Sequence, residues 1–151
     1  QYGFTGLHPM DNNLDIGEGD MSTAMRIYRR DLGQIRTCHI VVANCNSFRG
    51  ALIDDGTAYE LGYGNALGRP SYGYIDKLMP WKERILKHYF CVQTHDGKLA
   101  DREGYLLVDD FGTSINLMMQ CGMLALGGRL IEGDFERCLM TIRNDLTPIL
   151  F

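Results

Sequence analysis

Short apolar runs alternate with amphipathic segments along most of the chain, and this alternation predicts strands followed by helices. The run at 39–44 is β-branched and apolar at its centre, which is typical of a buried parallel strand. Apolar residues at helical spacing follow Ser22 as far as Ile35, and they predict a helix capped by Ser22. By the same criteria, further strands are predicted at 2–7 and 71–75, and further helices at 57–67, 80–89, 113 or 114 to 126, and 134–146.

The order of these elements predicts an α/β fold, with a parallel sheet covered by helices on both faces. The length of 151 residues fits one domain, and we expect a single domain over residues 1–151. Ligands of such sheets bind at the carboxyl ends of the strands. The loop at 45–56, after the most apolar strand, is therefore the first place to look for chemistry.

Charge and cysteine usage narrow the classes of partner. A net charge of −4 argues against nucleic acid, because phosphate binding needs a basic face. Five cysteines without a CxxC pair indicate free thiols in a reducing compartment, and hence a cytoplasmic protein. No apolar stretch is long enough to span a bilayer, and no signal peptide is recognisable. The histidines have no partners at ligand spacing, so no metal is expected.

Three acidic residues, Asp54, Asp55 and Glu60, surround the start of the helix at 57–67. One interpretation is structural: Thr57 caps the helix, and the Glu60 side chain accepts a hydrogen bond from the Thr57 backbone N–H, as in a capping box. The other is catalytic: one carboxylate attacks an anomeric carbon, and the second delivers a proton to the leaving group. The spacing alone favours the capping interpretation.

The residues around these acids change that balance, because they resemble the nucleoside 2-deoxyribosyltransferase family. The resemblance covers roughly residues 3–146 and reverses the preference in favour of a catalytic Glu60. Its motifs are Phe48-Arg49-Gly50, Asp54-x-Gly56-Thr57-Ala58-x-Glu60-Leu61-Gly62, Ala66-Leu67-Gly68-x-Pro70, and Asn116-Leu117-Met118 after Phe111-Gly112.

The resemblance implies a flavodoxin-like domain that moves 2-deoxyribose between nucleobases without a cofactor. Glu60 would be the nucleophile of a covalent, retaining, ping-pong reaction, and Asp54 would handle the proton of the base. Asn116 would bind the sugar from a neighbouring subunit, so a homo-oligomer with shared active sites is expected. Arg49, Phe48 and Gly56 would border the substrates, which are 2′-deoxyribonucleosides and free bases, in a nucleotide-salvage role.

The chain also departs from the family pattern. It begins at what corresponds to the second strand, so we expect the family's N-terminal strand and helix to be absent from this chain. Two alternatives therefore stay open beside the transferase. One is an N-glycosidase that hydrolyses deoxynucleosides or deoxynucleotides with the same nucleophile, and the other is a nucleotide-binding module without turnover.

Overall fold

Three short strands form a parallel sheet in the computed structural model, which describes residues 2–11, 19–105 and 111–147. The strands are β1 (Val41–Asn44), β2 (Ser71–Ile75) and β5 (Leu130–Glu132), in the order β1-β2-β5. In the register, Val41 lies opposite Ser71 and Gly73 lies opposite Leu130. The central strand β2 is therefore covered on both edges, as its nearly complete burial requires.

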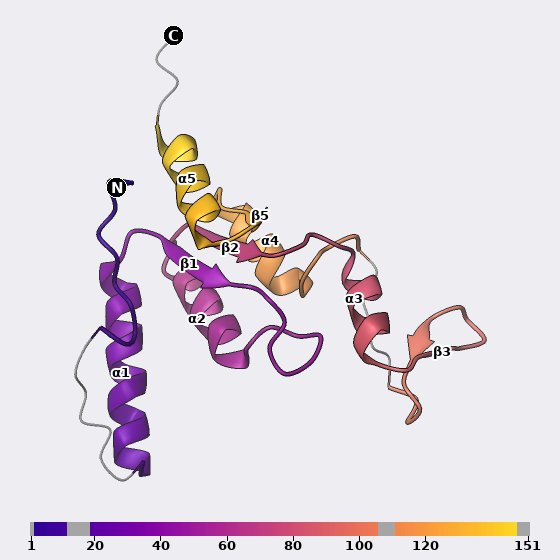
Figure 1. Ribbon diagram of the computed structural model, residues 1–151. Helices are drawn as coiled ribbons and strands as arrows, with labels where there is room; N and C mark the ends of the chain where they lie inside the picture. The colour runs from indigo at the N-terminus through magenta and orange to yellow at the C-terminus, as the bar shows by residue number, and fades with distance from the viewer. Residues whose placement is uncertain (1, 12–18, 106–110, 148–151) are drawn as a thin grey trace.

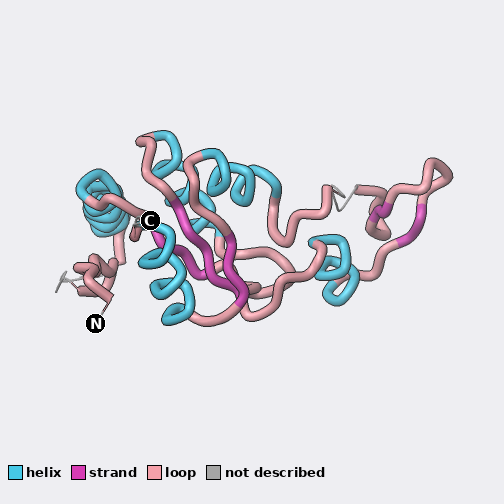
Figure 2. The backbone as a smooth tube through the Cα atoms, turned by 90° about the horizontal axis from the view of Figure 1, so that it is seen from above, coloured by secondary structure: helices cyan, strands magenta, loops and turns pink. Residues whose placement is uncertain are grey.

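Helices cover both faces of this sheet, as Figure 2 shows. On one face, α2 (Asp55–Ala66) and α4 (Leu117–Ala125) pack around a core that includes Leu61, Ile75 and Met123. On the other face, α5 (Phe135–Leu146) packs over Tyr72, and Cys138 and Ile142 fill that second core. The three-layer, flavodoxin-like arrangement expected from the sequence is confirmed.

The helix α1 (Met21–Thr37) packs on the outer side of α2 rather than on the sheet. Arg36 Nε donates a hydrogen bond of 2.6 Å to the Tyr63 hydroxyl, and its guanidinium lies over the Tyr63 ring. The strand expected at 2–7 is wrong, since this segment pairs with no strand in the described structure. The Tyr2 hydroxyl instead donates a hydrogen bond to the Glu136 carboxylate of α5.

A small unit projects from one end of this body (Figure 1). It contains α3 (Trp81–His88) and an antiparallel pair made of β3 (Val92–Gln93) and β4 (Leu99–Ala100). The pattern analysis places α3 within one residue at each end but gives no sign of the two short strands. Strands of two residues are too short to show an alternating pattern.

Close backbone approach explains one glycine of α2 but not its neighbour. A Cβ added at Gly64 would meet Val41 Cγ2 at 2.8 Å, so this position needs glycine to let α2 lie on β1. Gly62 has open space around it, with no atom within 4 Å of such a Cβ. Across the described residues, none of the helices has the length and apolar character needed to cross a membrane.

Candidate active site

The start of α2 is fixed by the carboxylate of Asp54. Its Oδ2 accepts hydrogen bonds from the Thr57 backbone N–H at 2.8 Å and from the Thr57 hydroxyl at 3.2 Å. Asp54 is thus the N-cap, and Thr57 is the third helical residue that it caps. The interpretation in which Thr57 caps the helix and Glu60 closes a capping box is wrong. The helix begins two residues earlier than the pattern predicted.

Gly56 keeps the first turn of α2 open beside this cap. A Cβ at position 56 would lie 3.1 Å from Asp54 Oδ2, which is tighter than ordinary van der Waals contact. A side chain here would push the capping carboxylate away from Thr57. Gly56 also lines a pocket on the outer side of the helix, where its missing side chain leaves space.

Glu60 lies in that pocket, in the cleft between α1 and α2. The pocket has a volume of about 270 Å³, close to the lower end of the ~300–1,000 Å³ typical of small-molecule sites. The Glu60 side chain is half-buried, and no hydrogen bond or ion pair to another described residue holds its carboxylate. The lining residues are Tyr28, Asp31, Leu32, Gly56, Tyr59 and Glu60.

Burial and neighbouring negative charge both raise the pKa of Glu60 above its ordinary value. Desolvation is the largest cause, and the charges of Asp31 and Asp54 add to it in that order. A carboxylate that is poorly solvated and unpaired is more basic and more nucleophilic than a solvated one. Such a group suits attack on an electrophilic carbon held in the pocket.

The α1 wall of the pocket contains residues that the sequence analysis did not single out. Arg30 donates to Asp31 Oδ1 from Nε at 3.0 Å and from Nη2 at 2.9 Å. At the rim, the Tyr28 and Tyr59 hydroxyls are hydrogen-bonded at 3.2 Å. The sequence held one sign of Asp31: this acidic residue directly precedes Leu32, which is on the buried side of an amphipathic helix.

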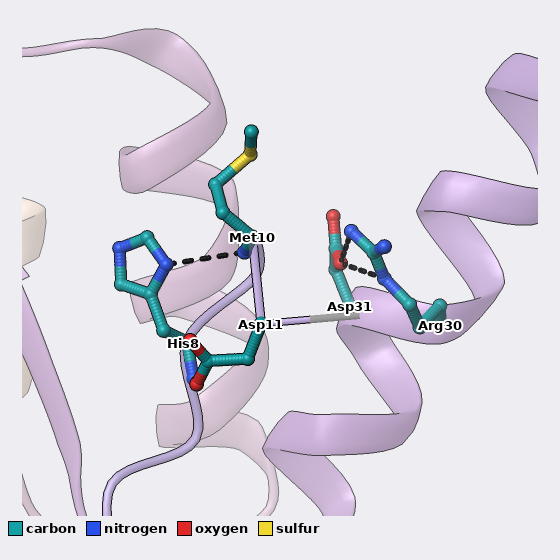
Figure 3. Close-up of polar contacts among 5 residues, drawn as sticks. All are labelled: His8, Met10, Asp11, Arg30 and Asp31. Carbon is teal, nitrogen blue, oxygen red and sulfur yellow. Dashed lines mark hydrogen bonds and ion pairs between the residues drawn. The ribbon is translucent and has the colours of Figure 1, made fainter. Parts of the chain in front are cut away.

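A tight turn of the N-terminal segment lies beside the part of α1 that carries Asp31 (Figure 3). The His8 backbone N–H donates to Asp11 Oδ2 at 2.9 Å, and the Met10 N–H donates to His8 Nδ1 at 3.1 Å. Asp11 therefore stabilises its own turn, and it is not among the residues that line the pocket of Glu60.

Asn116 lies at a different helix start, that of α4. It is the N-cap, and its Oδ1 accepts a hydrogen bond of 2.9 Å from the Met118 N–H, whereas Thr113 or Ser114 was expected to cap. Within the described residues, no hydrogen bond joins Asn116 to Asp54 or Glu60. The described hydrogen bonds of one chain therefore link Asn116 to neither carboxylate.

Phe48 and Arg49 lie at the tip of the loop between β1 and α2. The Phe48 ring is 50% exposed, and the Arg49 guanidinium stacks over it with its carbon 5.1 Å from the ring centre. Arg49 has a φ of 50°, in the left-handed region, and the next residue, Gly50, has a φ of 139°. Neither side chain lines the pocket of Glu60.

A second hollow, of about 380 Å³, lies on the projecting hairpin and is lined by Gln93, Thr94, His95 and Gly97. None of the predicted site residues borders it. We therefore assign the site to the smaller pocket around Glu60. In the described part of the chain, no group of three or more His, Cys, Asp or Glu residues is arranged to hold a metal ion.

Comparisons with known proteins show which family the chain resembles. The family model for nucleoside 2-deoxyribosyltransferase matches residues 1–118, a range that includes α1, α2 and Asn116. Among solved structures, a 2-desoxiribosyltransferase from Leishmania mexicana superposes with a TM-score of 0.66 at 27% identity. That match covers 93% of this chain and 77% of the other. No curated protein matches the chain.

Proposed function

The chain belongs to the nucleoside 2-deoxyribosyltransferase family, and on this premise we propose how its own residues move 2-deoxyribose from one nucleobase to another. The observation that carries the proposal is the half-buried Glu60 carboxylate, which has no partner among the described residues and lines a pocket beside the Asp54 cap. These features support Glu60 as the nucleophile.

In the first half-reaction, a Glu60 oxygen attacks C1′ of the deoxynucleoside and the C1′–N bond breaks. The electron pair of that bond leaves with the base, which takes up a proton. In the second half, a ring nitrogen of another base attacks C1′, the C1′–Glu60 bond breaks, and the base loses its proton. Two inversions give net retention, and the carboxylate is regenerated without a cofactor.

Asp54 supports the proton transfer because only one of its two oxygens is committed to the helix cap. Oδ2 accepts both hydrogen bonds from Thr57, and Oδ1 has no hydrogen bond with another described residue. We propose that the proton passes through Oδ1 between Asp54 and the base. The cap then holds the carboxyl group at a fixed position beside Gly56, which borders the substrate.

We propose that Asn116 acts on a neighbouring subunit of a homo-oligomer. Its Oδ1 is used by the Met118 N–H, but its Nδ2 remains available as a donor. Met118 and Leu124 on the same helix are 76% and 58% exposed, an apolar surface that suits a subunit contact. Phe48 and Arg49 are proposed to contact substrate from their loop, and the role is nucleotide salvage in the cytoplasm.

One incubation tests the proposed reaction against its alternatives. The chain is mixed with a 2′-deoxynucleoside, with and without a second free base, and the products are separated by chromatography. A new deoxynucleoside that appears only with the second base supports the transferase. Free 2-deoxyribose in its place identifies a hydrolase, and an unchanged deoxynucleoside that binds identifies a module without turnover.

A further inference from the structure

The projecting helix α3 contacts the loop between β1 and α2, which carries Phe48 and Arg49 (Figure 1). Arg84 of α3 donates a hydrogen bond from Nη1 to the Ser47 hydroxyl at 3.3 Å, and one from Nη2 to the Lys77 carbonyl at 3.0 Å. Ser47 follows β1 and Lys77 follows β2, so one guanidinium joins the carboxyl ends of two neighbouring strands. Ligands of parallel sheets bind at this edge.

Arg84 is a fixed group rather than a solvated surface arginine. It is half-buried, and its Nε is buried without a hydrogen-bond partner among the described residues. Burial lowers the pKa of its guanidinium, and the nearby charge of Asp76 opposes this shift. A second bond joins the same two segments, because Asn46 Oδ1 accepts from the Asp76 N–H at 2.9 Å. Both residues that precede Phe48, Asn46 and Ser47, are therefore anchored.

The tip of this loop has a backbone conformation that needs such support. Arg49 has a φ of 50°, in the left-handed region that residues other than glycine rarely adopt. A conformation of this kind persists only where the surrounding structure fixes it. The Ser47 hydroxyl donates to the Ala51 carbonyl at 3.5 Å, across the base of the loop. The Phe48 N–H donates to the Leu52 carbonyl at 2.8 Å. Ser47 thus connects the guanidinium of α3 to both sides of the loop.

A second contact of α3 limits the far side of the tip. The Tyr89 hydroxyl would lie 2.9 Å from a Cβ added at Gly50, whose φ is 139°. Tyr89 is the C-cap of α3, and its N–H donates to the Ile85 carbonyl at 2.8 Å. The tip therefore meets α3 at two points, with Arg84 before it and Tyr89 beside Gly50.

The loop offers a surface suited to the nucleobase rather than to the sugar. The sugar must lie at Glu60, because C1′ has to come within ~3–3.5 Å of its carboxylate to react. Phe48 and Arg49 do not line that pocket, so the part of the nucleoside within their reach is the base, which extends from the sugar. An aromatic ring and a guanidinium plane both stack on nucleobases. The place of this stacking surface is set by the backbone of the loop.

We propose that Arg84 is a positioning residue, which holds the loop so that Phe48 and Arg49 contact the nucleobase of the substrate. The projecting unit is then a support for the site rather than an appendage. The inference rests on the proposed function, because it needs a nucleoside bound with its sugar at Glu60.

The test separates the binding of the base from the chemistry at Glu60. Transfer is measured for wild type, Arg84→Ala and Arg84→Lys, with 2′-deoxyadenosine as donor and cytosine or hypoxanthine as acceptor. Arg84→Ala should raise KM by ~10-fold, about the worth of one hydrogen bond to a charged group, and leave kcat within about twofold. Arg84→Lys should lie between the two, since lysine lacks the planar fork that reaches both acceptors. A merely structural residue would lower kcat and leave KM unchanged.

Two further measurements show whether the effect passes through the loop. Added to Phe48→Ala/Arg49→Ala, the change Arg84→Ala should raise KM no further, because residues that act through one another are not additive. Hydrogen exchange of the substrate-free chain should be faster at the Phe48 amide in Arg84→Ala and unchanged in β2. This second measurement does not depend on turnover.

Arg129→Ala is the matched control. Arg129 also binds another segment, through Asp145 of α5 at 2.6 Å, but it lies at the amino end of β5, the opposite edge of the sheet. This variant should keep the wild-type KM and the wild-type exchange at Phe48. The affinity of Glu60→Ala and of Glu60→Ala/Arg84→Ala for 2′-deoxyadenosine is measured by calorimetry.

The proposal is overturned if Arg84→Ala leaves KM and affinity at the wild-type values, if it lowers only kcat, or if its effect adds to that of the loop variant. Absence of transfer by the wild type overturns only the proposed function when the affinity still falls on loss of Arg84. Without such a fall, both are overturned.

Discussion

The helices α2 and α5 begin in the same way on opposite faces of the sheet. Asp54 caps α2 by accepting a hydrogen bond of 2.8 Å from the Thr57 N–H, and Asp134 caps α5 by accepting one of 2.8 Å from the Arg137 N–H. Each helix also carries a glutamate within its first two turns, Glu60 in α2 and Glu136 in α5. The two helix starts therefore share an aspartate cap and a glutamate downstream of it, in the second turn of α2 and in the first turn of α5.

The surroundings of the two glutamates differ. Glu136 is exposed and accepts a hydrogen bond from Tyr2, so its carboxylate is solvated and partnered. Glu60 is half-buried under α1, in a pocket with Asp31 and without a partner among the described residues. The same cap followed by a glutamate thus gives two different environments for the carboxylate. The helix α1, which borders the pocket of Glu60, makes the difference.

Replacement of each glutamate by alanine should give the largest difference in transfer rate between changes in α2 and changes in α5. Glu60→Ala should lower transfer by on the order of 10⁴-fold or more, because a lost nucleophile cannot be replaced by binding alone. Glu136→Ala, its counterpart on α5, should leave transfer within about twofold. Initial rates and thermal melting of both variants are the measurement. A Glu60→Ala chain that transfers at near the wild-type rate would refute the nucleophile assignment.

Replacement of each capping aspartate by asparagine should give the next largest difference in transfer rate between α2 and α5. Asparagine caps a helix about as well as aspartate, so the fold is preserved while the carboxyl proton is lost. Asp54→Asn should slow transfer from natural deoxynucleosides by ~10²–10⁴-fold, and Asp134→Asn should not. A donor with an activated leaving group needs little proton help and should be spared in Asp54→Asn. Equal losses on both donors would argue for a structural Asp54 only.

The pH dependence of transfer should show the raised pKa of the half-buried Glu60. In the proposed mechanism ionised Glu60 is the nucleophile, so activity should fall as the pH drops through its pKa, and burial raises that pKa. The acid limb of kcat/KM should thus lie above the ordinary range of a glutamate. Asp31→Asn removes a neighbouring negative charge and should move the limb to lower pH, whereas Asp145→Asn should not. An acid limb that does not move in Asp31→Asn would show that this charge does not reach Glu60.

The smallest contrast concerns stability, where the two helices should behave alike. Asp54→Ala and Asp134→Ala each remove an N-cap, which costs ~1 kcal/mol of unfolding free energy. Urea denaturation of both variants, with the asparagine variants as references, measures this. A cost for Asp54→Ala well above that for Asp134→Ala would mean that Asp54 contributes more to the fold than its cap.

The pattern of apolar residues predicts most helices and strands around the three-stranded sheet, because each of them buries apolar residues at a regular spacing along its own sequence. The strand β2 is found at its predicted bounds, and α5 within one residue at its start. The strand β5 is missed because its three residues stand between glycines and are defined by pairing with β2. A Cβ at Gly128 would lie 1.8 Å from Ser71 O, a close approach that no local pattern reveals.

For the site, too, residues close together in the sequence can be predicted, whereas contacts between distant segments cannot. Glu60 and Asp54 lie in one short motif, so the sequence alone is enough to propose both, whereas the capping residue was misassigned. Asp54 and Thr57 are both good caps, and the path of the loop after β1 decides between them. Asp31 and Tyr28 belong to the site only because α1 packs on α2, a contact between helices that sequence spacing does not specify.

The most direct test of the central claim is to find the covalent sugar. The chain is incubated with a 2′-deoxynucleoside donor without an acceptor base and quenched, and its peptides are mapped by mass spectrometry. We predict one added 2-deoxyribosyl group on Glu60 and none on Glu136, lost again when a free base is supplied before the quench. A sugar on another residue of an active enzyme, or an adduct that survives the added base, would contradict the account.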